Sequence, residues 1–388
     1  MRTQSHRIMQ VQSPMIPVVG SWIAQHPGTI SLGQGIVHYG PPPQVRDAVR
    51  AALSESRIDR YGLVDGTANL LTALTAKLAG ENSIQCDESA CLLTTAGSNM
   101  AFVNAVLAIA DVDDEIILLA PFYFNHEMAI AMAGCRPVIV PTDDEYQIDI
   151  DALARAITAR TRAIVTISPN NPTGAVYSAQ TLASVNTLCR DQGLFHISDE
   201  AYEYFVYGGE SHFSPGSLPG AGDYTISLFS LSKAYGMAGW RVGYMVAPAS
   251  LETAIKKIQD TNLVCPPQVS QVAGAAALEA GRTWCAEQIT GFADVRDIVL
   301  AELSQLGGSC RVPRPDGAFY ALMQLDTSLA DIEIVERLIR EFGVAVMPGS
   351  TFGTTTTCSL RVAYGALDRD TVATGMGRLV HGLQTILA

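Results

Sequence analysis

The chain has 388 residues, of which 48% are hydrophobic and 16% are charged, and its formal net charge at pH 7 is -13. This length exceeds the size at which one hydrophobic core keeps growing, so two domains are expected. The negative charge repels nucleic-acid phosphates and anionic lipid surfaces, so neither is expected as a partner.

Membrane, secretion and metal signals are weak in this sequence. The longest uninterrupted apolar run, residues 116–124, is too short to cross a bilayer and contains Pro121. The N-terminal residues lack the apolar block of a secretory signal. The eight cysteines include no CxxC pair, which predicts reduced thiols and neither a zinc site nor a disulfide framework. These features predict a cytoplasmic protein without a metal site.

Helical and strand-like segments alternate from Val45 onward, where the first helical pattern begins. This alternation predicts an α/β fold with a mostly parallel sheet covered by helices. Ser178 and Gly193 are the expected start and stop of one helix, and Asp151 is the expected cap of another. Apolar runs too short for helices predict strands buried on both faces at residues 115–119, 137–140, 163–168, 194–198, 225–229 and 242–246.

The pattern changes near Gly281 to a long amphipathic helix that ends at Gly307 and Gly308. The predicted domain boundary lies inside that helix, with a large domain at residues 45–283 and a small domain at 284–388. Residues 1–44 have too little periodicity to fold alone, so we expect them to pack on the small domain or on a partner subunit.

Lys233 lies in the run FSLSKAYGMAGWRVGY, between a serine-bearing strand end and a glycine-rich turn. Arg241 follows eight residues later and brings a fixed positive charge back toward this lysine. Burial and a neighbouring cation lower the pKa of a lysine amine, and such amines bind carbonyl carbon as Schiff bases. The alternative is an ordinary loop lysine in solvent.

Gly97, Ser98 and Asn99 lie between the strand-like run CLLTT and the helical run MAFVNAVLAIA. Free backbone N–H groups at a helix start bind anions, and glycine permits close approach, so this turn is a candidate phosphate site. Ser230 and Arg241 would complete the same site from another part of the chain. A plain turn is the alternative.

Two further strand ends carry polar groups. Asp199 follows the run LFHIS, where a carboxylate at the carboxyl end of a strand can pair with a protonated pyridine nitrogen, and Tyr202 lies three residues on. Asn171 follows the run AIVTIS in a tight turn. The alternatives are an aspartate that caps the next turn and an asparagine that only shapes its loop.

The motifs NNPTG, SDEAYEYF, SLSKAYGMAGWRVGY, PDGAFY and SLRVAYG, in this order, resemble the class I and II aminotransferase family of fold type I pyridoxal-phosphate enzymes. The resemblance extends from Ser31 to the C-terminal helix. It implies a fold type I architecture, with a mostly parallel sheet in a large domain and a smaller α+β domain, and it implies pyridoxal 5'-phosphate as the cofactor.

The resemblance also implies roles for individual residues. Lys233 would bind the cofactor as a Schiff base, Asp199 would pair with its ring nitrogen, and Tyr202 and Asn171 would bind its ring oxygen. Tyr61 of YGLVDG would reach the phosphate from the other subunit, which implies a homodimer with shared sites. The remaining phosphate-binding residues would be Gly97, Ser98, Asn99, Ser230 and Arg241.

Substrate contacts follow from the same resemblance. Arg361 would form a bidentate pair with the substrate α-carboxylate, with Gly35 and Asn171 beside it. Tyr123 would stack on the cofactor ring. His126 matches a histidine that lies behind the aspartate in some members, although a core histidine is an equal alternative.

The implied reaction moves an amino group from an L-amino acid to a 2-oxo acid. GQGIVHYGPP and PFYFNHEMAIAMAG resemble an aromatic and methionine aminotransferase branch, and no further cation marks a pocket for a side-chain carboxylate, so an apolar or aromatic donor is expected. A carbon–sulfur lyase or an aminocyclopropane-carboxylate-synthase-like enzyme on the same site is the alternative. Transcription regulators that use this fold carry a DNA-binding domain before it, and too few residues precede Val45 for that.

Overall fold

A sheet of seven strands forms the centre of the larger part of the computed structural model, which describes residues 4–209 and 211–388. The strand order is β2-β8-β7-β6-β5-β3-β4. Strand β8 is antiparallel to both of its neighbours, β2 and β7, and every other neighbouring pair is parallel. The strands are β2 (Ala90–Thr95), β3 (Glu115–Ala120), β4 (Arg136–Pro141), β5 (Thr161–Ile167), β6 (Phe195–Asp199), β7 (Thr225–Ser230) and β8 (Gly243–Pro248). The predicted mostly parallel sheet is therefore confirmed.

Alternate residues of the strands face different helices, as the pleat requires. Ile116 and Leu118 of β3 pack with α5 (Ser98–Ile109), α6 (Phe124–Ala133) and α9 (Glu252–Asn262). Ile117 and Leu119 pack with α7 (Ile150–Ala156) and α8 (Ala179–Gln192) on the other face. The expectation of burial on both faces is wrong for β4, where Ile139 is 42% exposed, because β4 is the edge strand.

The sequence predicted both ends of α8 correctly but predicted the wrong N-cap for α7. Ser178 Oγ accepts from the backbone N–H of Thr181 to cap α8, and Gly193 ends that helix with φ of 66°. The cap of α7 is Asp149, whose side chain accepts from Ala152 N, so the expected cap at Asp151 is wrong. Asp151 lies in the first turn instead, where its charge favours the helix N-terminus.

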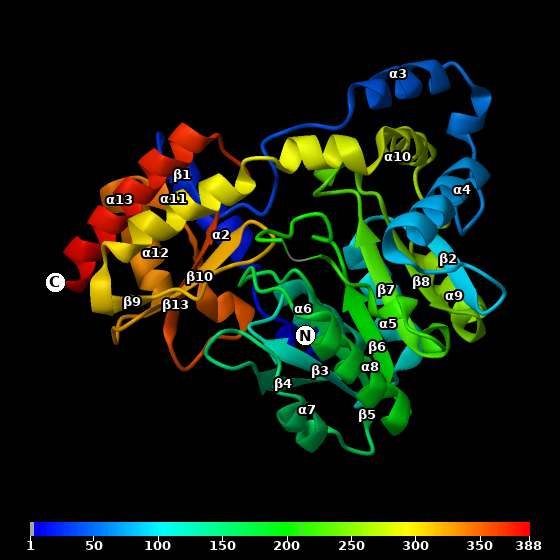
Figure 1. Cartoon of the computed structure of the whole chain (residues 1–388), viewed down its shortest axis with the longest axis horizontal. Helices are drawn as coiled ribbons and strands as arrows, with labels where there is room; N and C mark the ends of the chain where they lie inside the picture. The colour runs from blue at the N-terminus through cyan, green and yellow to red at the C-terminus, as the bar shows by residue number, and fades with distance from the viewer. Residues whose placement is uncertain (1–3, 210) are drawn as a thin grey trace.

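The C-terminal part forms a second layer around an antiparallel sheet of order β12-β13-β10-β9. Figure 1 shows the helices of this part gathered at the left, away from the large sheet. The strands are β9 (Cys310–Arg311), β10 (Tyr320–Leu325), β12 (Met347–Pro348) and β13 (Cys358–Ala363), and the helices are α11 (Phe292–Ser304), α12 (Asp331–Phe342) and α13 (Arg369–Leu387).

The N-terminal segment is more structured than its sequence pattern indicates. Two helices, α1 (His6–Gln10) and α2 (Met15–Gln25), precede Val45, so the expectation that the first helix begins there is wrong. Strand β1 (Ile30–Ser31) pairs in parallel with β11 (Val344–Ala345) of the C-terminal part. The other helices of the N-terminal half are α3 (Pro43–Ala52) and α4 (Ala68–Lys77).

The long amphipathic stretch forms two helices and not the single helix expected. It contains α10 (Gln268–Ile289), in which Gly281 has φ of 69°, and then α11, which begins after Gly291 with φ of 96°. Left-handed backbone of this kind interrupts a right-handed helix and favours glycine. The interruption at Gly281 supports the domain boundary that we propose at residues 283/284.

Three further properties concern the described part of the chain. None of its helices has the length and apolar character that a membrane span requires. None of its histidine, cysteine, aspartate and glutamate side chains form a cluster of three or more that could hold a metal ion. All eight cysteines lie within it and are unpaired.

Candidate active site

Three neighbouring strands of the large sheet end at the same edge and carry polar residues there. Asp199 is the last residue of β6, Ser230 is the last residue of β7, and Asn171 lies four residues after β5. Parallel strands present their carboxyl ends together, which is where ligands of open α/β sheets bind. The residues that line the cavity at this edge are Ser98, Asn99, Tyr123, Ile167, Asn171, Asp199, Ala201, Tyr202, Ser230, Ser232, Lys233 and Arg241.

The amine of Lys233 faces the centre of this cavity. Its Nζ donates to the backbone oxygen of Gly35 at 2.5 Å and lies 5.8 Å from the centre of the Tyr202 ring. Burial is the main cause that lowers the pKa of Lys233, from 10.5 to about 8, and the charges of Arg361 and Arg241 lower it further. A substantial fraction of this amine is therefore neutral, and hence nucleophilic, in mildly alkaline solution, where an ordinary lysine stays protonated.

The start of α5 forms an anion cup. Gly97 precedes the helix with φ of 84° and no side chain caps the first turn, so backbone N–H groups remain free. A Cβ atom on Gly97 would lie 2.4 Å from Nη2 of Arg241, so glycine is needed for the guanidinium to approach. Nη2 of Arg241 also donates to the backbone oxygen of Ala96 at 3.3 Å. Ser230 and Ser232 line the same end of the cavity.

Asp199 is a buried carboxylate at the opposite wall and is 4% exposed. Its Oδ1 accepts from the backbone N–H of Ala201 at 3.1 Å. Its Oδ2 lies 3.1 Å from Nε2 of His126, although neither ring nitrogen of His126 has an aligned hydrogen bond among the described residues. Phe102 stacks on the imidazole with 3.9 Å between ring centres. His126 is thus both packed in the core and adjacent to the aspartate.

Tyr202 and Asn171 line the same cavity as Asp199. Nδ2 of Asn171 donates to the hydroxyl oxygen of Tyr202 at 3.3 Å, and the hydroxyl groups of Tyr202 and Tyr320 are 2.7 Å apart. Burial raises the pKa of Tyr202 well above its ordinary value, so its phenol stays protonated.

Arg361 on β13 is 2% exposed and lines an outer pocket that adjoins this cavity at Tyr202 and Lys233. Nη1 donates to Oδ1 of Asn171 at 2.9 Å and Nη2 donates to the backbone oxygen of Gly33 at 2.7 Å. Its guanidinium lies 4.7 Å from the ring centres of both Tyr320 and Phe352. Nε has no hydrogen-bond partner and no carboxylate pairs with this charge among the described residues. The site is therefore suited to bind an anion.

The structure brings together all but one of the residues expected from the sequence. Tyr61 is 85% exposed and lines a separate groove with Leu263 and residues 265–269, outside the cavity around Lys233. Gly35 and Arg361 line an outer pocket that shares Tyr123, Asn171 and Lys233 with the inner cavity.

Several residues that line the outer pocket were not predicted from the sequence. Tyr320 lies in the motif PDGAFY, but nothing in its local pattern indicates that its hydroxyl reaches Tyr202. Ile16 comes from an N-terminal helix that was not predicted. The missed residues that line the outer pocket are Ile16, Gln34, Ile36, Phe124, Asn125 and Tyr320.

These groups fit a phosphorylated aldehyde cofactor. The anion cup at α5 suits a phosphate, the amine of Lys233 suits an aldehyde carbon, and the buried carboxylate of Asp199 suits a protonated ring nitrogen. The fold and the site together define a pyridoxal-phosphate enzyme of fold type I.

Comparison with known proteins specifies the family. A model of the family described as aminotransferase class I and II matches residues 27–379, and the chain belongs to this family. An aromatic aminotransferase of Arabidopsis thaliana is 32% identical over 392 residues, which cover 99% of this chain and 97% of the relative. A probable aspartate/prephenate aminotransferase of Aquifex aeolicus is 34% identical over 369 residues, or 92% of this chain and 91% of the relative.

Solved structures agree with this assignment. The aspartate aminotransferase of Thermus thermophilus with maleate has a TM-score of 0.90 at 31% identity, covering 99% of this chain and 100% of that one. The aromatic aminotransferase of Pyrococcus horikoshii has a TM-score of 0.86 at 31% identity, covering 95% of this chain and 99% of that one. The protein is a pyridoxal-phosphate-dependent aminotransferase, whose substrates are amino acids and 2-oxo acids.

Proposed function

We propose that the enzyme transfers the amino group of an L-amino acid with an aromatic, methionine or other apolar side chain to a 2-oxo acid. The lining of the outer pocket carries this proposal. Ile16, Ile36 and Phe124 supply apolar surface, and Lys233 and Arg361 are the only lysine or arginine side chains among the described residues that line it. A second substrate carboxylate would be desolvated there without a counter-charge of its own, which is costly.

The inner cavity supports the following arrangement of the cofactor. Asp199 would pair with the ring nitrogen, Tyr202 and Asn171 would bind the ring oxygen, and Tyr123 would contact the ring. The phosphate is bound by Gly97, Ser98, Asn99, Ser230 and Arg241. Pyridoxal phosphate supplies an aldehyde that binds amines covalently and a ring that accepts the electron pair released at the substrate Cα.

Lys233 then has two tasks in the proposed reaction. Its amine holds the cofactor until an amino acid displaces it, and the released amine takes the proton from the substrate Cα. The lowered pKa of Lys233 supports both tasks, because the neutral amine is the form that attacks carbonyl carbon and accepts a proton.

Arg361 is the proposed anchor of the substrate α-carboxylate. Its guanidinium carbon lies 4.7 Å from the ring centres of Tyr320 and Phe352, and Asn171 accepts from its Nη1. A planar guanidinium can donate two parallel hydrogen bonds to a carboxylate, which also orients the Cα–H bond. Gly35 lines the same pocket as this anchor.

We further propose a homodimer in which Tyr61 reaches the phosphate site of the partner subunit. The exposure of Tyr61 at 85% and of Leu63 at 68%, two large side chains of one loop, supports a contact surface there, since grouped exposed apolar side chains mark interaction sites. The unpaired cysteines suit the reducing cytoplasm that we propose as its location.

Absorbance spectra of the purified enzyme, before and after addition of single amino acids, test the proposed reaction. Phenylalanine, tyrosine and methionine are expected to convert the cofactor to its amine form with a kcat/KM at least about tenfold above that for aspartate, and a 2-oxo acid is expected to reverse the change. A higher kcat/KM for aspartate or alanine would contradict the apolar preference. Release of methanethiol, ammonia and 2-oxobutanoate from methionine with an unchanged cofactor band would indicate a lyase instead.

A further inference from the structure

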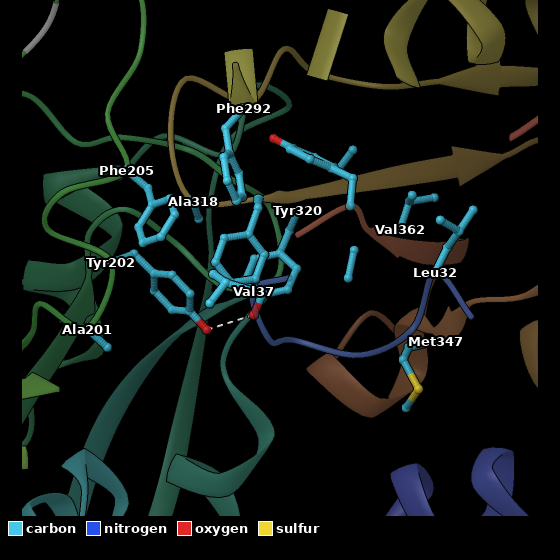
Figure 2. Packing of buried hydrophobic residues seen from close by; sticks show 14 of the residues in the cluster. Leu32, Val37, Ala201, Tyr202, Phe205, Phe292, Ala318, Tyr320, Met347 and Val362 are labelled. Carbon is cyan, nitrogen blue, oxygen red and sulfur yellow. Dashed lines mark hydrogen bonds between the residues drawn. The ribbon is translucent and has the colours of Figure 1, made fainter. Parts of the chain in front are cut away.

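Tyr202 and Tyr320 form a buried pair of tyrosines at the boundary between the inner cavity and the outer pocket. Their hydroxyl oxygens are 2.7 Å apart, and their ring planes meet at 80°. Figure 2 shows the two hydroxyl groups pointing toward each other, with Tyr202 on the side of Ala201 and Tyr320 on the side of Val37. Tyr320 has 0% exposure, so water does not reach its ring.

The direction of the hydrogen bond between them follows from the partners that each hydroxyl has. The only partner of the Tyr320 hydroxyl among the described residues is Tyr202, whereas Tyr202 also accepts from Nδ2 of Asn171. If Tyr202 donated to Tyr320, the hydrogen of Tyr320 would be buried without an acceptor, which is costly. If Tyr320 donates, its hydrogen is satisfied and Tyr202 accepts two hydrogen bonds.

This direction leaves the hydrogen of Tyr202 free to point into the cavity that Tyr202 lines. We propose that Tyr320 is a positioning residue that, by donating to Tyr202, holds Tyr202 as a hydrogen-bond donor toward the ring oxygen of pyridoxal phosphate. The inference rests on the proposed function, which assigns Tyr202 to that oxygen.

The surroundings of Tyr320 keep its hydroxyl in place. The guanidinium of Arg361 lies 4.7 Å from the centre of its ring. A Cβ atom at Gly35 would lie 2.4 Å from the Tyr320 hydroxyl oxygen, so the backbone of Gly35 closes over that group. The same Gly35 accepts from Lys233 through its backbone oxygen. Tyr320 therefore lies against both Gly35, whose backbone oxygen accepts from Lys233, and Arg361, the proposed anchor of the substrate carboxylate.

A donor at the ring oxygen has a measurable consequence. It stabilises negative charge on that oxygen. This charge is least compensated when the nitrogen atom that joins Lys233 to the cofactor carries no proton. Donation from Tyr320 polarises the Tyr202 hydroxyl and strengthens it as a donor. Loss of the Tyr320 hydroxyl is therefore expected to raise the pKa of the Lys233–cofactor linkage, by about 0.5 to 1 unit if one ordinary hydrogen bond is lost.

The test is a spectrophotometric pH titration of the purified holoenzyme. Tyr320→Phe removes the hydroxyl and keeps the ring over Arg361, and Tyr202→Phe removes the group through which Tyr320 is proposed to act. Tyr364→Phe is the matched control, because Tyr364 is equally buried and its hydroxyl has no hydrogen-bond partner among the described residues. Y320F is expected to raise the pH midpoint at which the Lys233–cofactor linkage loses its proton. Y364F is expected to leave this midpoint unchanged.

The double variant Tyr202→Phe/Tyr320→Phe separates an action through Tyr202 from a direct one. The midpoint of the double variant is expected to equal that of Y202F, since Tyr320 has nothing left to position. Equal midpoints for Y320F and Y364F, or an undiminished Y320F shift in the Y202F background, would overturn the inference. If Y202F itself leaves the midpoint unchanged, the assignment of Tyr202 in the proposed function fails as well, so the two failures are distinguishable.

Gly35→Ala perturbs the same hydroxyl group by a second route. The added methyl group would collide with the Tyr320 hydroxyl oxygen, so that oxygen or the Gly35 backbone, which accepts from Lys233, must move. An upward shift of the midpoint is expected that disappears when Tyr320→Phe removes the colliding oxygen, and additive shifts of the two variants would overturn the inference.

Discussion

The backbone oxygen of Gly35 accepts a hydrogen bond from the side-chain amine of Lys233, with 2.5 Å between the atoms and 198 residues between them in sequence. Through this contact the N-terminal segment reaches the carboxyl edge of the large sheet. It also places the amine beside Arg361, whose charge helps to lower the pKa of Lys233. The reactivity of the lysine thus depends on segments far from its own motif.

Lys233→Ala is expected to retain the fold and lose the covalently bound cofactor. The amine is the only group of the cavity that can bond to an aldehyde carbon as a primary amine, since no other lysine lines it. Absorbance after gel filtration and circular dichroism check the two expectations. Lys257→Ala, at an exposed position of α9, is the control and should keep the cofactor band. A normal band in K233A would remove Lys233 from its proposed role.

Capture of pyridoxal phosphate by the cofactor-free protein is expected to depend on pH through Lys233. The protonated amine does not attack a carbonyl, and the folded-state pKa is lowered to about 8. The rate constant of capture should therefore rise about tenfold per unit below pH 8 and level off above it. Stopped-flow absorbance measures this rate. A rate that keeps rising up to the ordinary pKa of 10.5 would show that the amine is not perturbed.

Gly97→Ala is expected to weaken cofactor binding by about tenfold or more, because the new Cβ would displace Arg241 from the anion cup. Gly281→Ala is the matched control. Gly281 has φ of 69° and ψ of -174°, similar to the φ of 84° and ψ of 165° at Gly97, but a Cβ there meets nothing within 4 Å. The control shares the backbone strain without the collision. Dissociation constants of pyridoxal phosphate for the two variants separate the two effects, and equal values would argue against a phosphate role for this turn.

Arg361→Lys is expected to raise KM for the amino donor by about tenfold or more and to change kcat less, because lysine keeps the charge but cannot donate the paired hydrogen bonds. The cofactor spectrum should persist, since Arg361 lies in the outer pocket. Steady-state kinetics with phenylalanine measure the effect. Arg311→Lys, on the surface and paired with Glu145, serves as control and should match the wild type. Parallel losses in both variants would point to a general loss of stability.

Mixed dimers test whether Tyr61 serves the partner's site. Lys233→Ala and Tyr61→Ala chains are each expected to have low activity alone. Random mixing should restore about one quarter of the wild-type activity, because half of the dimers then contain one intact site. The two chains carry different affinity tags, so the mixed dimer can be isolated and assayed. Absence of any recovery would mean that Tyr61 and Lys233 of one chain act together, or that no dimer forms.

Local sequence patterns predicted most of the sheet and most of the site chemistry. The strands around Asp199 and Ser230 are short apolar runs that end in polar groups, and such runs are recognisable without knowledge of their neighbours. The same holds for Ser178 and Gly193, since a cap and a stop act within a few residues. Where two local signals competed, as at Asp149 and Asp151, the choice depended on hydrogen-bond geometry.

Other features depend on contacts that a local pattern does not contain. The exposure of β4 follows from its place at the edge of the sheet, and the helix interruption at Gly281 lies beside the domain boundary that we propose. The helix that carries Ile16 was missed because its apolar residues pack on partners at the other end of the chain, such as α12.

The sequence by itself determined which chemical groups stand at the strand ends: an amine at Lys233, a carboxylate at Asp199 and glycine at position 97. Only the tertiary structure decided which of them meet. Lys233 and Gly35 are 198 residues apart, Arg361 and Asn171 are 190 apart, and Tyr202 and Tyr320 are 118 apart. Motifs are read within a few residues, whereas a hydrogen bond across such a span exists only once packing has fixed two distant segments at one distance and direction.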